Sequence, residues 1–416
     1  MTGAADRHGA SPGSLLHRVN LANVGGVEVS FAQYSAHRRA SSCGDSLLFD
    51  GAVHPRFTAA TDGLHPVHDR AGLKRWHGLR VPRVARRTRA RLAARVYRRA
   101  APTAVLAWNT FGNREVAAIA KALDRPLIYY EHGNAWRSRA PHAGYFLEHT
   151  AGIITNSHAA ARILALRWGW QGPTARVYCA VAAQEIAEHA RGAATLGRPL
   201  RLGAAGRLAE FKGQIPALHA LAHLREQHGI DATLTLAGEG PARSRLAALA
   251  GRLGIEPAVC FAGLVDRMRD FYDRIDILLV PSLREPFGRV SIEAQARGCP
   301  VVVAGVDGLP ETLAPGDADQ VVVPRLPPSH YTRLGGDSRQ LPPWVFDPGS
   351  DQLVEPHACA PEDLAAAVAR LVASPQHYAA ASARALDNVR KRFTETDYND
   401  QLDAAIAQLV AVGAAT

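Results

Sequence analysis

Several sequence features that would assign the chain to other protein classes are missing. No run of about 18 apolar residues occurs in the 416-residue chain, so no membrane-spanning helix is expected. Met1–Ser14 is polar and rich in glycine and alanine, without the apolar stretch of a secretory signal. The five cysteines are scattered and never spaced as C-x-x-C, which indicates reduced thiols. We therefore expect a cytoplasmic protein.

Motifs of two common enzyme classes are also absent. Gly238–Arg243 begins like the dinucleotide-binding fingerprint G-x-G-x-x-G but lacks its third glycine, which argues against a dehydrogenase. No G-x-S-x-G sequence occurs, so the nucleophile elbow of an α/β-hydrolase is missing. The enzyme classes that depend on these loops are therefore not expected.

The net charge of +10 is concentrated in one part of the chain. Segment 74–99 carries eleven lysine and arginine residues and no acidic residue. Leu92, Val96 and Tyr97 lie among the arginines at helical spacing, so the segment is amphipathic. It suits an anionic membrane surface, where each basic residue contributes about 1 kcal/mol; a solvated helix face is the alternative. Nucleic acid is not expected as a partner, because no recognised binding module accompanies the charge.

Strand-like and helix-like segments alternate from about residue 100 onward, a pattern typical of α/β proteins with parallel sheets. The alternation pauses over the polar passage Gln184–Arg198 and then starts again. Two successive blocks predict two doubly wound domains with a hinge near this passage. The expected organisation is an N-terminal domain over 1–190, a C-terminal domain over 191–395, and a final helix over 396–416 packing back toward the N-terminal domain. The Pro- and Gly-rich segment 325–352 is predicted to be a surface insertion.

The most informative segment is residues 285–293, E-P-F-G-R-V-S-I-E. It places two carboxylates, Glu285 and Glu293, eight positions apart. The apolar run Asp276–Ser282 before it predicts a buried parallel strand, and Ile292–Gly298 after it has helical spacing. A helix N-terminus carries about half a positive charge and unpaired N–H groups, so it attracts anions. Two acids beside such a site suggest a ligand that has both phosphates and hydroxyls, which is a nucleotide sugar.

A second segment supplies cations. Residues Gly203–Gly213 read G-A-A-G-R-L-A-E-F-K-G, a strand that ends in a glycine turn at Gly206. Arg207 and Lys212 bracket the start of the next predicted helix. Arginine can fork onto a phosphate, and lysine adds a point charge. We expect a pyrophosphate to lie between these cations and the helix that begins at Gly288.

The ordered set of motifs resembles the retaining glycosyltransferases of family 4. The motifs are G-R-L with K-G (206–213), L-A-G-E-G-P (236–241), F-A-G (261–263), P-S-x-x-E-P-F-G with E-A (281–294) and G-x-P-V-V (298–302). The match runs in order from Gly203 to Glu311, and more loosely from Gly25 to the C-terminus. The resemblance implies the GT-B architecture, an α/β fold of two Rossmann-like, doubly wound domains facing each other across a cleft.

The resemblance also implies the roles of individual residues in binding the donor. Glu285 would contact the hydroxyls of the donor sugar, and Glu293 would contact those of the ribose. Arg207 and Lys212 would hold the diphosphate. The other donor contacts would come from the glycine turn and the carboxylate segment: Gly206, Phe287, Gly288, Arg289 and Val290. Pro286 stands where many family members have glycine, which removes one possible N–H donor.

In the N-terminal domain, Gly25 and Gly26 follow the first predicted strand, where the family has a glycine loop near the diphosphate and the acceptor. Glycines allow the backbone to approach a ligand closely. His132, in E-H-G-N, follows the strand that ends at Tyr130 and matches a family position facing the donor sugar. Ligands of α/β domains bind at the carboxyl ends of strands. His132 is therefore predicted to act with Glu285 in catalysis.

The reaction implied by the resemblance is transfer of a hexosyl or N-acetylhexosaminyl group from a nucleoside diphosphate sugar to a hydroxyl, with retention of configuration. The departing diphosphate would help to deprotonate the acceptor, so no side-chain general base is required. Neither a metal ion nor a cofactor is expected. The basic segment 74–99 suggests a saccharide or lipid-linked acceptor and work at the inner face of the membrane. The expected role is the synthesis of cell-envelope polysaccharides or glycoconjugates.

Alternative functions remain open on sequence grounds. A metal-dependent transferase would use a D-x-D pair, but Asp317–Asp319 stands in a loop before Val321, outside the expected order of nucleotide-binding segments. His65 and His68 form too small a cluster to predict a metal site. A nucleotide-sugar epimerase of the same fold is a second possibility. A non-catalytic basic protein of the membrane surface is a third, although the intact carboxylates and cations argue against it.

Overall fold

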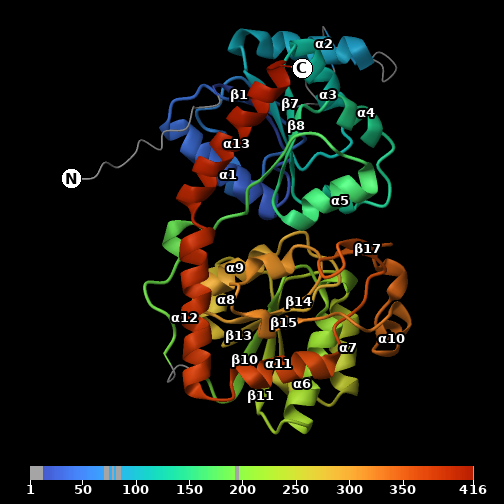
Figure 1. Ribbon diagram of the computed structural model, residues 1–416, viewed down its shortest axis with the longest axis vertical. Helices are drawn as coiled ribbons and strands as arrows, with labels where there is room; N and C mark the ends of the chain where they lie inside the picture. Colours follow the sequence, from blue (N-terminus) through green and yellow to red (C-terminus); the bar gives the residue numbers. More distant parts are fainter. Residues whose placement is uncertain (1–12, 70–74, 77–78, 81–85, 193–195, 416) are drawn as a thin grey trace, which may run out of the picture. The chain divides into compact units, whose positions relative to one another are not determined.

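The computed structural model describes residues 13–69, 75–76, 79–80, 86–192 and 196–415 (Figure 1). The chain divides into two compact units. Unit 1 consists of Met1–Cys179 together with Glu395–Thr416, and unit 2 consists of Ala180–Thr394. Each unit is an α/β domain with its own parallel sheet, which confirms the two Rossmann-like domains predicted from the sequence.

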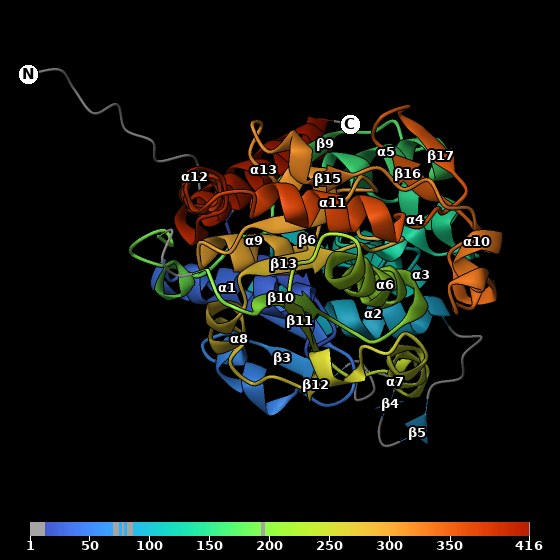
Figure 2. The same ribbon diagram turned by 90° about the horizontal axis from the view of Figure 1, so that it is seen from below.

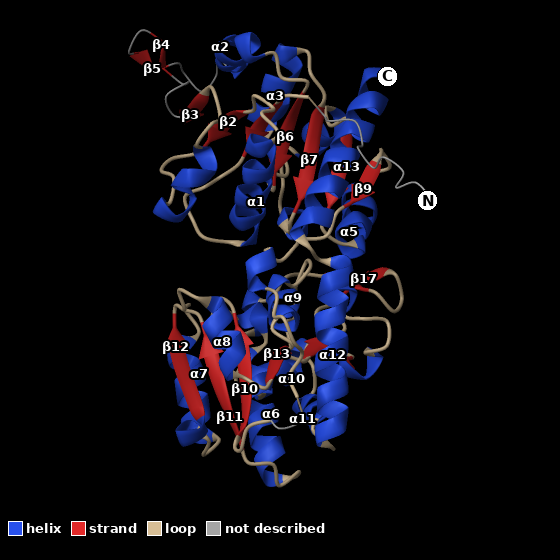
Figure 3. Cartoon of the chain, turned by 90° about the vertical axis from the view of Figure 1, so that its left-hand side faces the viewer, coloured by secondary structure: helices blue, strands red, loops and turns tan. Residues whose placement is uncertain are grey.

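The main sheet of unit 1 has seven parallel strands in the order β3-β2-β1-β6-β7-β8-β9 (Figure 3). The central strands are buried along their whole length, as expected for a parallel sheet covered on both faces. The strands are β1 (Leu15–Arg18), β2 (Ser46–Phe49), β3 (Val67–Asp69), β6 (Ala104–Trp108), β7 (Leu127–Glu131), β8 (Gly152–Thr155) and β9 (Thr174–Arg176). A separate antiparallel pair consists of β4 (Arg75–Trp76) and β5 (Leu79–Arg80).

Helices connect the strands of unit 1. They are α1 (Gly26–Ala40), α2 (Arg86–Tyr97), α3 (Arg114–Leu123), α4 (Ala143–Glu148), α5 (His158–Trp168) and α13 (Glu395–Ala415), with 3-10 turns η1 (Pro55–Thr61), η3 (Arg98–Ala100) and η4 (Asn134–Trp136). Local capping explains where two of them begin. The Asn113 side chain accepts hydrogen bonds from two backbone N–H groups of α3, and the Ser157 hydroxyl accepts one from α5.

The last helix, α13, belongs to unit 1 although unit 2 precedes it in the chain. Its Asp403 carboxylate accepts a hydrogen bond of 2.5 Å from the Tyr34 hydroxyl and lies 3.0 Å from His37 Nε2. At its far end, Leu409 packs so closely on β8 that a Cβ atom at Gly152 would overlap its side chain. Polar contacts with α1 and apolar contacts with β8 therefore hold α13 on this unit.

The sheet of unit 2 has six parallel strands in the order β12-β11-β10-β13-β14-β15. They are β10 (Leu200–Ala205), β11 (Ala232–Ala237), β12 (Val259–Gly263), β13 (Ile277–Val280), β14 (Val301–Ala304) and β15 (Val321–Val322). All six contain residues that the sequence predicts to be extended, because the apolar runs are short and end in glycine, proline or polar residues. The strand order reverses between β10 and β13, which pair directly.

The helices of unit 2 surround this sheet. They are α6 (Gln214–Glu226), α7 (Arg243–Arg252), α8 (Met268–Arg274), α9 (Arg289–Ala296), α10 (Pro328–Arg333), α11 (Pro361–Leu371) and α12 (Pro375–Arg392). Short 3-10 turns are η5 (Ala183–Glu185), η7 (Glu210–Lys212), η8 (Glu256–Ala258), η9 (Leu309–Thr312), η10 (Ala318–Gln320) and η11 (Ser338–Gln340). Helices α6 and α11 pack side by side on one face of the sheet (Figure 2).

The division between the units lies at Cys179, before the passage Gln184–Arg198 in which the hinge is predicted. Part of this passage is bound to unit 2. The Arg191 side chain donates to the backbone carbonyls of Arg297 and Tyr272 at 3.0 and 2.6 Å. These contacts attach Arg191 to unit 2, and the hinge near this passage stays a prediction.

Segment 325–352 is more than the surface insertion predicted from its proline and glycine content. It contains α10 and η11, and its end forms β16 (Val345–Asp347), which pairs antiparallel with β17 (Gln352–Val354). Tyr331 and Phe346 are completely buried. The insertion therefore contributes to the core of unit 2 and, as described below, contacts two segments of the candidate site.

Candidate donor-binding site

The candidate site in unit 2 lies where the strand order of the sheet reverses. Strands β10 and β13 are neighbours, and the glycine turn follows β10 whereas the carboxylate segment follows β13. Because both strands are parallel, the two loops meet at the same carboxyl edge of the sheet. Ligands of open α/β sheets bind at such a reversal point.

The two loops approach each other so closely that glycine is required at their contact. Gly213 has a φ of +72°, and a Cβ atom there would overlap the carbonyl oxygen of Pro281. Within the glycine turn, Gly206 has a φ of +132° and donates its N–H to the Ala237 carbonyl at 2.9 Å. A Cβ atom at Gly238 would in turn overlap the carbonyl oxygen of Gly206. Glycine at these positions thus allows close backbone packing. This packing brings the loop that carries Arg207 and Lys212 (the cationic loop) against the loop that carries Glu285 (the carboxylate loop).

The closest pair in the site joins residues from these two loops. Lys212 Nζ lies 2.5 Å from Glu285 Oε2, a charge-assisted hydrogen bond. The Ser282 hydroxyl lies 3.4 Å from the same carboxylate oxygen. The side chains of Lys212 and Glu285 are 20% and 11% exposed, so the pair is largely enclosed yet still accessible. Two residues that the sequence assigns to donor binding are therefore in direct contact.

Glu293 lies on α9, one turn after the helix begins. Its Oε1 lies 3.3 Å from Arg289 Nε, and its Oε2 accepts a hydrogen bond of 2.9 Å from the Tyr272 hydroxyl. Burial raises the pKa of Tyr272 well above its ordinary value, and the neighbouring Glu293 charge raises it further, so the phenol stays a hydrogen-bond donor. The Glu293 carboxylate is thus held in place from two sides.

The start of α9 faces the same edge of the sheet. Gly288 precedes the helix with a φ of +104°, and a Cβ atom there would contact Leu309. Phe287 is buried, and its ring lies 5.8 Å from that of Phe393. The first-turn N–H groups at Arg289 and Val290 therefore follow a loop anchored by the core, which suits the binding of an anion.

Arg207 and Pro286 are less constrained. The Arg207 side chain is exposed, and among the residues that the structure describes it forms no ion pair. Its backbone carbonyl accepts a hydrogen bond of 3.0 Å from Gln214 Nε2, which fixes the loop but does not engage the guanidinium. Pro286 is partly exposed between the two buried residues of the loop.

Asp307 is a site-supporting residue that the sequence analysis missed. It is 1% exposed, and its Oδ2 accepts a hydrogen bond of 2.9 Å from the backbone N–H of Glu285. Its Oδ1 accepts one of 2.8 Å from the N–H of Phe346, on β16 of the insertion. One buried carboxylate thus links the insertion to the backbone of the predicted catalytic glutamate. An aspartate before a glycine in a loop is too common to indicate this role.

Glu210 links the insertion to the other loop of the site. It is 4% exposed and forms an ion pair with Arg245. Its Oε2 accepts hydrogen bonds of 2.9 Å from the Tyr331 hydroxyl and from the backbone N–H of Asp337. Burial and the Glu210 charge both raise the pKa of Tyr331, which keeps its hydroxyl protonated. The insertion therefore braces the cationic loop two residues before Lys212.

Arg284 is a further cation beside the site that was not recognised in the sequence. Its guanidinium carbon lies 4.5 Å from the centroid of the Phe211 ring, next to Lys212 in the chain. Burial lowers the pKa of Arg284, although the charges of Asp307 and Glu285 oppose this effect. Its Nε atom has no hydrogen-bond partner among the described residues.

In unit 1, His132 follows β7 at the carboxyl edge of the sheet. Its backbone N–H donates to Asn109 Oδ1 at 3.3 Å, and Asn109 itself adopts a left-handed conformation with a φ of +47°. The neighbouring Glu131 is buried, and its carboxylate accepts a hydrogen bond of 3.0 Å from the N–H of Ala135. The His132 ring stacks at 6.1 Å from the ring of Trp108. Its position is therefore fixed by the turn and by aromatic packing.

Gly25 and Gly26 lie at the start of α1, after β1. Gly25 is the N-cap residue, with extended backbone angles that any residue can adopt. A Cβ atom there would contact only the carboxylate of Glu28, a side chain that can move. The backbone conformation does not by itself require glycine at Gly25. Strands β1, β6 and β7 are adjacent and parallel, so this loop and the turn of His132 lie on one edge of unit 1.

The other candidate ligand groups have structural partners. Asp317 is 2% exposed, and its carboxylate accepts a hydrogen bond of 2.6 Å from Arg384 Nε, whereas Asp319 is exposed. The His68 ring packs edge-on against Tyr97. Within the described ranges, no three His, Cys, Asp or Glu residues are grouped to hold a metal ion. No described helix is long and apolar enough to cross a membrane.

The part of the chain that contains this site is similar to known glycosyltransferases. Residues 199–333 match the family model described as glycosyl transferases group 1. An uncharacterized glycosyltransferase of Methanocaldococcus jannaschii is 37% identical over 143 residues, which is 34% of this chain and 35% of that protein. D-inositol 3-phosphate glycosyltransferase of Streptomyces bingchenggensis is 37% identical over 139 residues, 31% of this chain and 30% of that protein. The chain thus spans about a third of the length of these curated relatives.

Solved glycosyltransferase structures resemble nearly the whole chain. Anabaena HepE, solved in complex with UDP and glucose, aligns with a TM-score of 0.68 and 17% identity over 93% of this chain and 97% of that one. A Rickettsia africae glycosyltransferase aligns with a TM-score of 0.72 and 14% identity over 96% of this chain and 98% of that one. The chain therefore has the GT-B fold, and residues 199–333 of its unit 2 are similar to the glycosyl transferases group 1 family.

Proposed function

We propose that the chain is a retaining, metal-independent glycosyltransferase of family 4. It would transfer a hexosyl or N-acetylhexosaminyl group from a nucleoside diphosphate sugar to a hydroxyl of a saccharide or lipid-linked acceptor. The observation that carries this proposal is the Lys212–Glu285 pair at the reversal point of the unit 2 sheet. A cation and a carboxylate placed there serve the two parts of such a donor, its phosphates and its hydroxyls.

The diphosphate is the leaving group, so the site must stabilise the negative charge that develops on it. Lys212 and Arg207 would bind its oxygens, and the N-terminus of α9 would add its backbone N–H groups. Arg284 is a third cation within the same two loops. In this proposal the leaving diphosphate itself takes the acceptor proton, which places acceptor and leaving group on one face of the sugar and retains the configuration.

The carboxylates would orient the rest of the donor. Glu285 would accept hydrogen bonds from hydroxyls of the transferred sugar and stabilise positive charge at the anomeric carbon. Glu293, held by Tyr272 and Arg289, would accept hydrogen bonds from the ribose hydroxyls. Lys212 already contacts Glu285. When the diphosphate binds, the Lys212 ammonium group would therefore contact both the diphosphate and the Glu285 carboxylate, and would position them relative to each other.

Unit 1 would bind the acceptor. His132 and the loop at Gly25 and Gly26 lie on one edge of its sheet, which is the edge where α/β domains bind ligands. We propose that His132 contacts the transferred sugar. Helix α2, inside the basic segment 74–99, would hold the protein at the inner face of an anionic membrane, which would favour a role in envelope polysaccharide or glycoconjugate synthesis. Four basic residues of the segment precede α2. Lys74 and Arg83 lie outside the described residues, and the side chains of Arg75 and Arg80 are not described.

Slow hydrolysis of the donor tests the proposed chemistry without knowledge of the acceptor. The purified protein is incubated with UDP-glucose, UDP-N-acetylglucosamine and their GDP, ADP and dTDP counterparts, with and without EDTA. Proton NMR then follows the first sugar released. We expect donors with an α-linked sugar to release the α-anomer of that sugar first. The rate of release should be the same with and without EDTA. Release of the β-anomer would contradict retention, inhibition by EDTA would contradict metal independence, and a changed nucleotide sugar without release would indicate an epimerase.

A further inference from the structure

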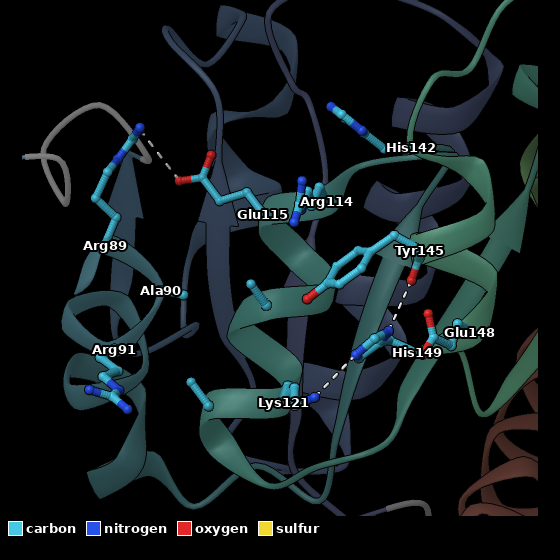
Figure 4. Close-up of a pocket in the computed structure, with 12 residues that line it drawn as sticks. Arg89, Ala90, Arg91, Arg114, Glu115, Lys121, His142, Tyr145, Glu148 and His149 are labelled. Carbon is cyan, nitrogen blue, oxygen red and sulfur yellow. Dashed lines mark hydrogen bonds and ion pairs between the residues drawn. The ribbon is translucent and has the colours of Figure 1, made fainter. Parts of the chain in front are cut away.

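A cavity of about 700 Å³ lies in unit 1 between helices α2, α3 and α4 (Figure 4). Its volume is within the range of about 300–1,000 Å³ typical of small-molecule sites. Cations from two of the helices line it: Arg89 and Arg91 come from α2, and Arg114 and Lys121 come from α3. Tyr145 of α4 lies between the α3 cations in the view of Figure 4. Neither the donor site nor the edge that carries His132 includes any of these residues.

The cations of this cavity are only partly neutralised. Arg89 Nη2 lies 3.7 Å from Glu115 Oε1, a loose ion pair. The Nε atom of Arg89 is buried and has no hydrogen-bond partner in the part of the chain that the structure describes. Within that same part, no carboxylate pairs with Arg91, Arg114 or Lys121. Four cations thus face two acids, Glu115 and Glu148, which leaves an excess of positive charge and a buried donor.

Lys121 lies beside a histidine that is itself hydrogen-bonded to the backbone. Its Nζ lies 3.3 Å from His149 Nε2, and His149 Nδ1 lies 3.0 Å from the Tyr145 carbonyl oxygen. An ammonium group only donates, so Nε2 accepts from Lys121 and Nδ1 carries the hydrogen given to the carbonyl. In this arrangement two of the three ammonium hydrogens remain for another acceptor.

Arg114 is held by an aromatic stack. Its guanidinium carbon lies 4.7 Å from the centroid of the Tyr145 ring, and the His149 ring stacks on Tyr145 at 4.3 Å and 29°. A guanidinium held over a ring keeps its N–H donors directed outward, in the forked arrangement that matches phosphate oxygens. The same stack positions both Arg114 and, through His149, Lys121. Arg114 and Lys121 are exposed side chains, and these contacts hold both of them at the cavity.

We propose that this cavity binds the phosphate group of a small molecule, with Arg114 and Lys121 as its main contacts. The group is a phosphate monoester or a diphosphate, carried either by a soluble compound or by the headgroup of a membrane lipid. The site is separate from the proposed transferase chemistry. Whether it binds phosphate does not depend on which donor unit 2 binds.

Calorimetric titration with inorganic pyrophosphate tests the proposal. The full-length chain is used with R207A and K212A, so that the cations of the donor site do not contribute. We expect saturable binding to one site at 0.15 M salt, and an increase in Kd of about tenfold or more when R114S and K121S are added. The matched control, R274S with R333S, removes two exposed charges of unit 2 that lie outside the cavity, the donor site and segment 74–99. It should change Kd by less than about twofold, because neither residue lines the cavity and charges far from it are screened at this salt.

Vesicles distinguish the two sources of the phosphate group. Phosphatidylcholine vesicles with phosphatidic acid bind a headgroup site, and pure phosphatidylcholine vesicles serve as the blank. Loss of vesicle binding in R114S/K121S but not in R274S/R333S assigns the site to a lipid headgroup. Equal vesicle binding by both pairs, with the pyrophosphate difference preserved, assigns it to a soluble compound. The proposal is overturned if pyrophosphate does not bind, or if both pairs weaken it equally while thermal unfolding shows both to be folded.

Discussion

We expect the substitution Glu285→Gln to lower the rate of sugar release or transfer by about 100- to 1,000-fold, because removing one preorganised stabiliser of developing charge has effects of this size. The amide keeps the shape of the side chain but removes the negative charge that would stabilise the anomeric carbon. Nucleotide affinity should change little, since Lys212 is then free to bind the diphosphate alone. Single-turnover measurements with the best donor, together with calorimetric titration of the nucleotide, separate the two effects.

The control for this substitution is Glu355→Gln, an exposed carboxylate of the same unit with no side-chain partner among the described residues. It should leave both turnover and nucleotide affinity unchanged. If Glu285→Gln kept normal turnover, Glu285 would have no catalytic role, and the Lys212–Glu285 contact would be only structural. A fall in affinity with normal turnover at saturating donor would assign Glu285 to ground-state binding alone.

The substitution Gly213→Ala should have the largest effect on stability. Gly213 has a φ of +72°, and its new Cβ atom would overlap the carbonyl oxygen of Pro281, where the two loops of the site meet. Backbone cannot move aside as a flexible side chain can, so we expect the free energy of unfolding of unit 2 to fall by about 3 kcal/mol or more. Denaturant unfolding measures this change, and nucleotide titration at low temperature measures the damage to the site.

Gly229→Ala provides a matched control for the steric effect. Gly229 has a similar φ of +60° in the same unit, but a Cβ atom added there would have no neighbouring side chain or backbone within 4 Å. Its substitution should therefore cost only the strain of the left-handed conformation, about 1 kcal/mol. Equal losses for the two variants would mean that the contact between the loops is not tight, and the described geometry of the site would be wrong.

The sequence was sufficient to predict the parts of the site that depend on local signals. The apolar run before Glu285 predicted β13, and the helical spacing after it predicted α9. Gly203–Gly213 likewise predicted a strand followed by a glycine turn. Parallel strands then bring these two loops to one edge, so the Lys212–Glu285 contact follows from the order of the strands.

The supporting contacts could not be predicted, because they join residues far apart in the chain. Asp307 bonds the N–H groups of both Glu285 and Phe346, and nothing near Asp307 in the sequence indicates either partner. Tyr331 lies in a segment whose proline and glycine content suggested a surface loop, yet its hydroxyl reaches the buried Glu210. The short strands β2 and β3 were also missed, since three or four residues are too few for a clear alternation.

The most direct test of the central claim, that unit 2 binds a nucleoside diphosphate through its two loops, is a thermal-shift panel of UDP, GDP, ADP and dTDP in EDTA. We expect one nucleotide to raise the Tm without metal, because a ligand that binds only the folded state stabilises it. The same nucleotide should give no shift with the R207A/K212A variant. If no nucleotide stabilises the protein, if stabilisation needs a metal ion, or if the variant responds like the wild type, the assignment of the donor site is contradicted.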